Sequence, residues 1–468
     1  MSFVSIEFLL LFTGVIFGLL IFRKHLYKKF IILLASCVFY AYWDWRFLGL
    51  IALVTFFDYF ISRYLANSES KSARKKMLVL SITLNLSILG IFKYFNFFVD
   101  NLNLIFSPFG FEYSGMEIIL PVGISFYIFE TISYVIDIYR RVAEPADSLL
   151  DYAVFVTFFP RLVAGPIMRA AHFLPQIKRQ IALNIDNFVN GAHIFAQGLF
   201  KKIVVADRLA IMVDQIYASP SIYSSPTVWL AVFSYSIQIY FDFSGYSDMA
   251  IGLGKIMGFD LPLNFNLPYV SQSITEFWKR WHISLSTWLR DYLYIPLGGN
   301  RKGRARTYLN LLITMLLGGL WHGASWNFVV WGGLHGLYLS LERIFNYEQY
   351  VSRFKQSDIS AWIRFLCTFV VISVTWVFFR SPSYATSLVI LKKLAFISGE
   401  TNIVWWYWPA MIAVFGTLVV GWFIAKRGQQ VWALDYRKPQ TIPFLIGEYL
   451  FIFVFSISNV SPFIYFQF

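Results

Sequence analysis

Long apolar runs separated by short polar segments repeat along the whole chain. The first run covers residues 3–22, and comparable runs lie at 77–97, 119–138 and 228–257. A helix of about 20 apolar residues crosses the hydrocarbon core of a bilayer. The first run has no basic segment before it and no small-residue cleavage site, so we expect it to be a retained span. Further runs lie at 30–43, 47–65, 203–217, 307–321, 327–341, 361–380, 403–424 and 443–464.

These runs predict an all-α, multi-pass membrane protein with about 12 spans. The composition agrees, because 58% of the 468 residues are hydrophobic and only 14% are charged, against about 25% charged in soluble domains. The net charge of +13 comes mostly from short loops between runs, which is typical of the positive-inside bias. We therefore expect contact with membrane lipids and no nucleic-acid partner.

The basic loops also predict a topology. The cluster between residues 23 and 29 is expected in the cytoplasm, which places the N-terminus outside, and the segment 100–117 has no Lys or Arg, as expected of an outside loop. No repeat or low-complexity linker divides the chain. We therefore expect one membrane domain over 1–468, with a basic, non-spanning insert at 259–306.

Two segments depart from the spanning pattern. The run 151–167 contains Pro160, Arg161 and Gly165 and returns to a basic region on the side it left. It predicts a re-entrant or interfacial element rather than a full span. Non-helical backbone at membrane depth is tolerated only when it is buried in protein or lines a cavity. The short runs 307–321 and 327–341 flank His322 and are each shorter than a comfortable span.

The insert at 259–306 contains a signal for the start of a helix. Ser273 followed by Glu276 forms a capping box. Apolar residues then recur at intervals of three and four, at Phe277, Trp281, Leu285 and Trp288. We therefore expect one amphipathic helix lying in the interface on the cytoplasmic side.

Histidine is the best candidate for chemistry. The six histidines are His25, His172, His193, His282, His322 and His335. His322 lies between apolar runs, where an ionisable group is costly and usually functional, and a neutral imidazole accepts a proton from a hydroxyl at physiological pH. The sequence has no G-x-S-x-G elbow, His-x4-Asp box or P-loop, and no histidines spaced as metal ligands. We expect no metal, no bound cofactor and no disulfide between Cys37 and Cys367.

Carboxylates within the apolar runs offer an alternative. Asp242 and Asp248 lie in a helical run interrupted by Ser244 and Gly245. A proton-coupled transporter or polysaccharide flippase could use such acids. A structural role, with each acid paired to an arginine or a backbone amide, explains them equally well at this point.

Several longer strings resemble one family. They are Gly-Gly-Leu-Trp-His-Gly (318–323), the string 276–300 from Glu-Phe-Trp-Lys-Arg-Trp-His to Pro-Leu-Gly-Gly-Asn, Tyr-Phe-Asp-Phe-Ser-Gly-Tyr-Ser-Asp-Met-Ala (240–250), 120–130, 164–166 and 462–468. They look like the membrane-bound O-acyltransferase (MBOAT) family, and within it the bacterial branch that acetylates polysaccharides. The resemblance covers essentially the whole chain.

The resemblance implies an all-helical fold of about 11–13 helices around a central funnel or tunnel. His322 would match the catalytic histidine of the family, and His282 the second conserved polar position, often Asn or His in relatives. We expect the other polar and aromatic members of the motifs to line the substrate path: Trp281, Trp321, Asp242, Ser244, Asp248, Arg290 and Asp291.

The implied reaction moves an acetyl group across the bacterial inner (cytoplasmic) membrane for O-acetylation of an exported polysaccharide, most like alginate. The donor would be acetyl-CoA, and the acetyl group would go to a periplasmic SGNH-type partner or directly to the polysaccharide. O-acetylation of peptidoglycan or of cellulose remains an alternative. So does D-alanylation of teichoic acids, for which the sequence motifs match less well. The sequence leaves the acceptor, a covalent acyl-histidine and the oligomeric state open.

Overall fold

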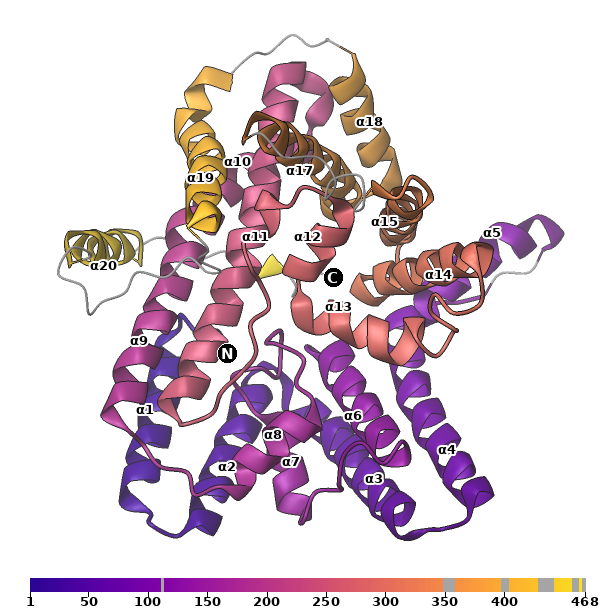
Figure 1. The fold of residues 1–468 in the computed structure, drawn as a ribbon, viewed down its shortest axis with the longest axis vertical. Coiled ribbons are helices and arrows are strands. Elements are labelled where there is room, and N and C mark those ends of the chain that lie inside the picture. The colour runs from indigo at the N-terminus through magenta and orange to yellow at the C-terminus, as the bar shows by residue number, and fades with distance from the viewer. Residues whose placement is uncertain (111–112, 348–357, 397–403, 428–441, 457–462, 465–468) are drawn as a thin grey trace. The chain divides into compact units, whose positions relative to one another are not determined.

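The computed structural model describes residues 1–468 except 111–112, 348–357, 397–403, 428–441, 457–462 and 465–468. Within the described residues, every regular element is a helix (Figure 1). The prediction of an all-α fold is therefore confirmed. Of the motif at 462–468, only Phe463 and Ile464 lie within the described residues.

The described residues form two compact units. One comprises residues 1–195 and 247–262, and the other comprises residues 196–246 and 263–468. Helix α11 (Ser225–Ile256) contributes residues to both. The single domain over 1–468 with an insert at 259–306 stays a prediction.

The first unit consists of helices joined mostly by short turns. In chain order they are α1 (Ile6–Ile21), α2 (His25–Asp44), η1 (Trp45–Phe47), α3 (Leu48–Asn67), α4 (Lys71–Leu89), η2 (Gly90–Tyr94), α5 (Phe95–Phe106), η3 (Ser107–Phe109), α6 (Ile124–Tyr139), α7 (Leu149–Thr157), α8 (Ala170–Lys178) and most of α9 (Ile185–Phe200). The predicted turn between the runs 30–43 and 47–65 is confirmed. At this turn Asp44 is extended, and its carboxylate accepts the N–H of Arg46 and pairs with the guanidinium of the same residue.

The segment after α7 bears out the expectation of buried non-helical backbone. Helix α7 has nine residues, too few to span, and residues 158–168 are buried and non-helical. Glu130 of α6 holds both ends of this segment, because its carboxylate pairs with Arg161 and accepts the N–H of Met168 at 2.9 Å. Arg161 also lies over the Phe155 ring. The bond to Met168 gives this backbone a polar partner inside the protein, where such partners are needed.

The second unit contains the motifs that carry the family resemblance. After the end of α9 its elements are η4 (Lys201–Ala206), α10 (Asp207–Ala218), η5 (Pro220–Ile222), the first part of α11, η6 (Pro268–Val270), α12 (Ile274–Arg280), α13 (Ile283–Leu289), η7 (Arg290–Tyr294), α14 (Arg304–His322), α15 (Trp326–Ile344), α17 (Asp358–Arg380), α18 (Tyr384–Ala395), η8 (Val404–Tyr407), α19 (Trp408–Lys426) and α20 (Ile442–Ser456). The most extensive contact between two helices in this unit joins α14 and α15.

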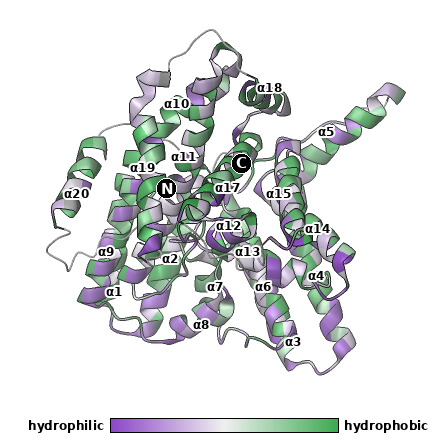
Figure 2. Cartoon of the chain, turned by 45° about the horizontal axis from the view of Figure 1, so that its top comes forward, coloured by the Kyte–Doolittle hydropathy of each residue, from purple (hydrophilic) through white to green (hydrophobic). Residues whose placement is uncertain are grey.

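Four helical stretches among the described residues are long and apolar enough to cross a membrane. They are His25–Asn67, which contains α2 and α3, Lys71–Phe109, Asp358–Arg380 and Trp405–Lys426. Figure 2 shows polar residues gathered at the turn between α3 and α4, with apolar residues along the helices. The chain is therefore a multi-pass membrane protein, whereas the count of about 12 spans stays a prediction.

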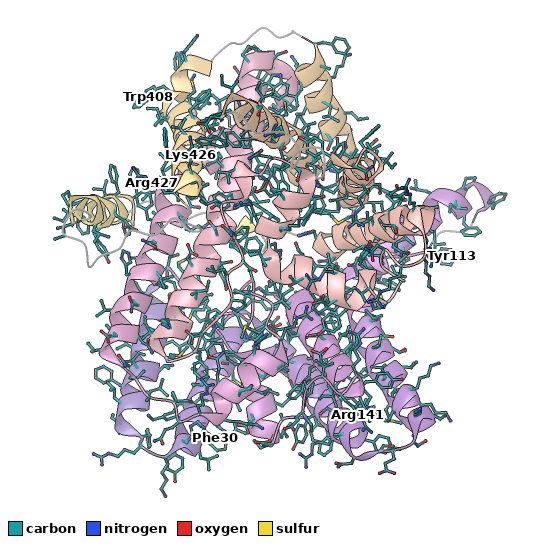
Figure 3. The ribbon with its side chains drawn as sticks, in the orientation of Figure 1. Phe30, Tyr113, Arg141, Trp408, Lys426 and Arg427 are labelled. Atoms are coloured by element: carbon teal, nitrogen blue, oxygen red, sulfur yellow. The ribbon has the colours of Figure 1, made fainter. Side chains whose placement is uncertain are left out.

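Helix α19 has the ends expected of a span. Trp408 lies at one end, and Lys426 with Arg427 lies at the other (Figure 3). Its 19 residues extend about 28 Å at 1.5 Å per residue, close to the thickness of the hydrocarbon core. Aromatic and basic residues at opposite ends are typical of helices anchored at both interfaces.

Some helices extend beyond the apolar runs. Helices α14 and α15 have 19 residues each, so the two runs around His322 are not unusually short once their polar ends are included. The run at 203–217 is the second half of a helical stretch that begins at Ile185 with α9. Helix α9 was not predicted as an apolar run, because polar residues occupy one face of it. Helix α18 lay outside the predicted runs as well.

Candidate functional site

His322 is the last residue of α14, at the turn of a helical hairpin. Gly323 follows in extended backbone, and the Ser325 hydroxyl then accepts the N–H of Asn327 at 3.3 Å to begin α15. The two helices pack backbone against backbone. A Cβ at Gly332 would overlap the carbonyl oxygen of Met315, so this close contact requires glycine.

We therefore expect Gly332→Ala to push α15 away from α14. Overpacking of this kind costs about 1–3 kcal/mol, and activity should fall with stability because His322 ends the same hairpin. Gly333→Ala is the matched control, since its Cβ would meet only the Leu316 side chain at 3.4 Å. Thermal unfolding in detergent, with activity, checks both. Equal unfolding temperatures for the two variants would contradict this account of the hairpin.

Aromatic rings surround the imidazole of His322. The ring is 5% exposed, and its centroid lies 5.0 Å from that of Trp321, 5.2 Å from Trp331 and 5.0 Å from Phe379. The rings come from α14, α15 and α17, so three helices fix the position of His322. Such a setting excludes bulk water and strengthens polar interactions with a bound group.

The insert does not form one continuous amphipathic helix, so that prediction is wrong, whereas its location at the interface stays a prediction. Helix α12 ends at Arg280, and α13 begins at Ile283. Between them His282 has a left-handed backbone, with φ of +41°. The predicted apolar face is buried inside the second unit rather than laid on a surface: Phe277, Trp281, Leu285 and Trp288.

The loop before α12 explains why the chain breaks at His282. The N–H of Asn266 donates to the carbonyl of Arg280 at 2.9 Å, and the N–H of Ile283 donates to the carbonyl of Asn264 at 2.9 Å. These two bonds hold the backbone on both sides of His282. Left-handed backbone is uncommon outside glycine, but histidine, asparagine and aspartate adopt it more readily than other residues.

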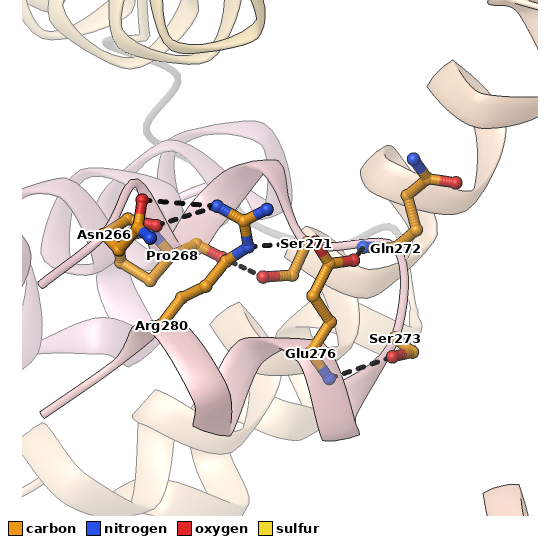
Figure 4. Close-up of polar contacts among 7 residues, drawn as sticks. All are labelled: Asn266, Pro268, Ser271, Gln272, Ser273, Glu276 and Arg280. Carbon is orange, nitrogen blue, oxygen red and sulfur yellow. Dashed lines mark hydrogen bonds and ion pairs between the residues drawn. The ribbon is translucent and has the colours of Figure 1, made fainter. Parts of the chain in front are cut away.

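The capping signal at Ser273 is confirmed in part. The hydroxyl of Ser273 accepts the N–H of Glu276 at 3.0 Å, which begins α12 (Figure 4). The Glu276 carboxylate accepts the N–H of Gln272 instead of that of Ser273, and it pairs with Arg280 at 2.9 Å. Arg280 also donates to the carbonyl of Asn266 at 3.1 Å, so this network links the start of α12 to the loop that fixes His282.

Trp321 connects the two histidines that the motifs singled out. The His282 ring lies 6.0 Å from that of Trp321, and Trp321 lies 5.0 Å from His322, between ring centroids. His282 is fully buried, and burial lowers its pKa to about 3, so the imidazole is neutral at physiological pH. Residues 40 positions apart in the sequence thus form one cluster, which we call the histidine pair.

We expect His282→Asn to fold normally and His282→Val to be destabilised. Asparagine tolerates left-handed backbone, whereas a β-branched residue there is strained, and the left-handed penalty is about 1–2 kcal/mol. Thermal unfolding in detergent measures the difference, and the activity of the Asn variant shows whether a polar group suffices in place of imidazole. A Val variant as stable as the Asn variant would exclude a backbone requirement here.

The remaining motif residues fall at different places. Trp281 is buried and lies 5.1 Å from Trp376, between ring centroids. Ser244 is buried on α11, two residues after Asp242. Asp248 follows six residues after Asp242 on the same helix, at an angular separation of about 120° around the axis, and belongs to the first unit.

Asp242 lies in a buried ionic cluster. Its Oδ1 atom is 2.6 Å from Lys202 Nζ, which also lies 2.8 Å from Asp207 Oδ1. Its Oδ2 atom accepts the N–H of Ile464 at 2.8 Å. Each oxygen of the carboxylate thus has a partner within the protein, and its role in a substrate path stays a prediction.

Arg290 and Asp291 lie at the end of α13 away from His282. They pair with each other at 2.7 Å, and their side chains are 60% and 34% exposed. Seven residues of α13 separate them from His282, about 10 Å along the helix. Their role in a substrate path stays a prediction.

Two buried residues of the second unit, His335 and Lys202, received no role from the sequence. His335 is fully buried, accepts the Trp278 indole N–H at Nδ1 at 3.3 Å and lies 3.1 Å from the Thr375 hydroxyl at Nε2. Because indole only donates, Nδ1 carries no proton, and His335 is a fixed neutral ring beside Trp331. Lys202 was hidden at the polar start of an apolar run. The one sequence signal that could have pointed to His335 is the pair of glycines on either side of it, Gly333 and Gly336.

Comparisons with known proteins identify the family of this chain. A family model described as MBOAT, membrane-bound O-acyltransferase family, matches residues 36–381. The chain is 47% identical to the probable alginate O-acetylase AlgI of Pseudomonas putida over 82% of this chain and 78% of that protein. It is 40% identical to a peptidoglycan O-acetyltransferase of Helicobacter pylori over 81% and 75%.

A more distant relative is the teichoic acid D-alanyltransferase of Streptococcus thermophilus, 31% identical over 46% of this chain and 55% of that protein. The poorer match to this class agrees with the ranking drawn from the motifs. The family model includes both members of the histidine pair. With the helical fold and the apolar spans, these matches show that the chain belongs to the membrane-bound O-acyltransferase family and is an acyltransferase.

Proposed function

We propose that this enzyme moves an acetyl group from cytosolic acetyl-CoA across the bacterial inner membrane for O-acetylation of an exported polysaccharide, most like alginate. The observation that carries the proposal is the histidine pair, in a chain 47% identical over 82% of its length to a probable alginate O-acetylase. A periplasmic SGNH-type protein takes the acetyl group, or the polysaccharide receives it directly.

His322 acts as the general base in this proposal. A hydroxyl oxygen of the acceptor bonds to the acetyl carbonyl carbon, the carbon–sulfur bond of the thioester breaks, and CoA leaves as a thiolate. The imidazole takes the hydroxyl proton and returns it to the thiolate, so protons balance. General-base catalysis by a positioned histidine contributes about 10²–10⁴-fold in rate.

His282 serves the donor side. Its neutral ring accepts or donates one hydrogen bond at each nitrogen according to tautomer, which suits it to orient the thioester carbonyl rather than to hold a charge. Trp281, Trp321 and Ser244 supply walls of the path between the two rings.

Peptidoglycan is the second candidate acceptor, favoured by the 40% identity to a peptidoglycan O-acetyltransferase. A polysaccharide flippase receives less support, because Asp242 is engaged by Lys202 and by the Ile464 amide. Cellulose and teichoic acid acceptors rank below these two.

Sealed membrane vesicles carrying the enzyme, with the cytoplasmic face outward, test the proposal. Acetyl-CoA labelled in the acetyl group is added outside, and unacetylated alginate, peptidoglycan or cellulose oligomers are loaded inside, with and without an SGNH-type partner. We expect labelled ester inside the vesicles, most in the alginate arm, and none in vesicles without the enzyme. No enzyme-dependent loss of acetyl-CoA in any arm would overturn the proposal, and label in the peptidoglycan arm alone would reassign the acceptor.

A further inference from the structure

The described end of the chain is anchored in the second unit. Phe463 and Ile464 are both 5% exposed. The backbone N–H of Ile464 donates to Asp242 Oδ2 at 2.8 Å, and the Phe463 ring stacks on Tyr246 with centroids 4.6 Å apart. A segment 222 residues away in sequence from Asp242 is thus held by one buried carboxylate and one aromatic stack.

The Lys202 cluster sets the geometry of that carboxylate. Lys202 Nζ lies between Asp242 Oδ1 and Asp207 Oδ1, and the three side chains are 7%, 2% and 2% exposed. Lys202 lies on the π-helix η4, and single π-turns inside α-helices frequently occur at functional sites. One oxygen of Asp242 is fixed by the ammonium, so its other oxygen presents a fixed acceptor to the Ile464 amide.

The anchored segment reaches the histidine pair through one ring. Phe463 lies 5.9 Å from Phe243, and the Phe243 ring meets His282 edge-on, with centroids 4.6 Å apart and planes at 85°. Phe243 is the residue next to Asp242 and is fully buried. The segment that Asp242 holds therefore supports the ring that packs against His282.

We propose that Phe463 and Ile464 form a positioning element for the reaction: Asp242 seats this segment, Phe463 supports Phe243, and Phe243 sets the orientation of the His282 ring toward Trp321. Asp242 and Phe463 are positioning residues that act through Phe243, and the effect on catalysis rests on the proposed role of His282. The effect on the orientation of the His282 ring does not depend on which acyl group or acceptor the enzyme uses.

Ile464→Pro and Ile464→Ala separate the amide contact from packing. Proline removes the N–H that Asp242 accepts, whereas alanine keeps the N–H and removes more of the side chain. Turnover is measured with acetyl-CoA in detergent, together with thermal unfolding. We expect kcat of the Pro variant to fall about ten- to hundredfold with KM for acetyl-CoA within about twofold, because small misplacements of reacting groups cost rate. The Ala variant should keep most of kcat.

NMR of protein labelled in histidine with ¹⁵N gives a readout independent of turnover. The His282 signals, assigned by their loss in His282→Asn, feel the ring current of Phe243. We expect these signals to shift in Ile464→Pro and Phe463→Leu and to stay in place in Ile464→Ala.

Unchanged His282 signals in folded Ile464→Pro would overturn the positioning role. Equal shifts in the Pro and Ala variants would assign the effect to packing and overturn the role proposed for Asp242. Shifted signals in an enzyme that fails to use acetyl-CoA would keep this inference while rejecting the proposed donor.

Discussion

Replacement of His322 by alanine is expected to abolish acetyl transfer while the protein remains folded in detergent. The expected loss is at least about 10²–10⁴-fold, the contribution of a positioned general base. His322 is enclosed by Trp321, Trp331 and Phe379, so bulk water has little access to replace the missing imidazole. Label transferred from acetyl-CoA to polysaccharide is the measurement.

Two further variants make this experiment decisive. Alanine leaves a cavity at a site that is 5% exposed, and cavities in packed cores cost stability. His322→Gln keeps much of the volume without a basic ring and should be equally inactive. His172→Ala is the matched control, because His172 is exposed on α8 of the first unit. Normal acetylation by folded His322→Ala would remove His322 from the chemistry.

The second large effect is expected at Lys202. Lys202→Met leaves the carboxylates of Asp207 and Asp242 buried without their shared ammonium. Removal of one partner from a buried ionic group costs about 3–5 kcal/mol, because the remaining charge is uncompensated. Thermal or denaturant unfolding in detergent should show this loss.

The companion variants identify the cause of that loss. Replacing the charged cluster as a whole, with Lys202→Met, Asp207→Asn and Asp242→Asn together, should restore much of the stability, since removal of all the charges leaves none unpaired. Lys255→Met is the control, because its pair with Asp260 is exposed and worth about 0–1 kcal/mol. A Lys202→Met protein as stable as Lys255→Met would show that the cluster does not stabilise the second unit.

Hydropathy and turn chemistry predicted much of the helical framework. The turn between α2 and α3 and the buried non-helical segment after α7 were both expected, because Asp44, Pro160 and Gly165 interrupt apolar runs. Helix α9 was missed, since a helix with one polar face does not stand out in a hydropathy pattern. The break at His282 was missed because the spacing of Phe277, Trp281, Leu285 and Trp288 fits one continuous helix, and tertiary hydrogen bonds from the loop at 264–266 override it.

The candidate site was predictable to a similar extent. The two Trp-His pairs drew attention to His322 and His282, and the structure places both rings next to the ring of Trp321. Lys202 was not predictable, because a lysine at the edge of an apolar run also fits the positive-inside bias. Its role depends on Asp207 and Asp242, and only the folded second unit brings Asp242 to it. The supporting rings from α15 and α17 depend on packing in the same way.

The contact of Trp321 with both imidazoles has a consequence for proton transfer. An indole ring has one N–H donor and no acceptor, so it cannot take a proton on one side and release it on the other. Trp321 thus relays no proton, although its ring centroid lies 6.0 Å from that of His282 and 5.0 Å from that of His322. His282 and His322 therefore cannot pass a proton to each other through this ring, so His322 must itself return the proton that it takes, as in the proposed transfer to the CoA thiolate.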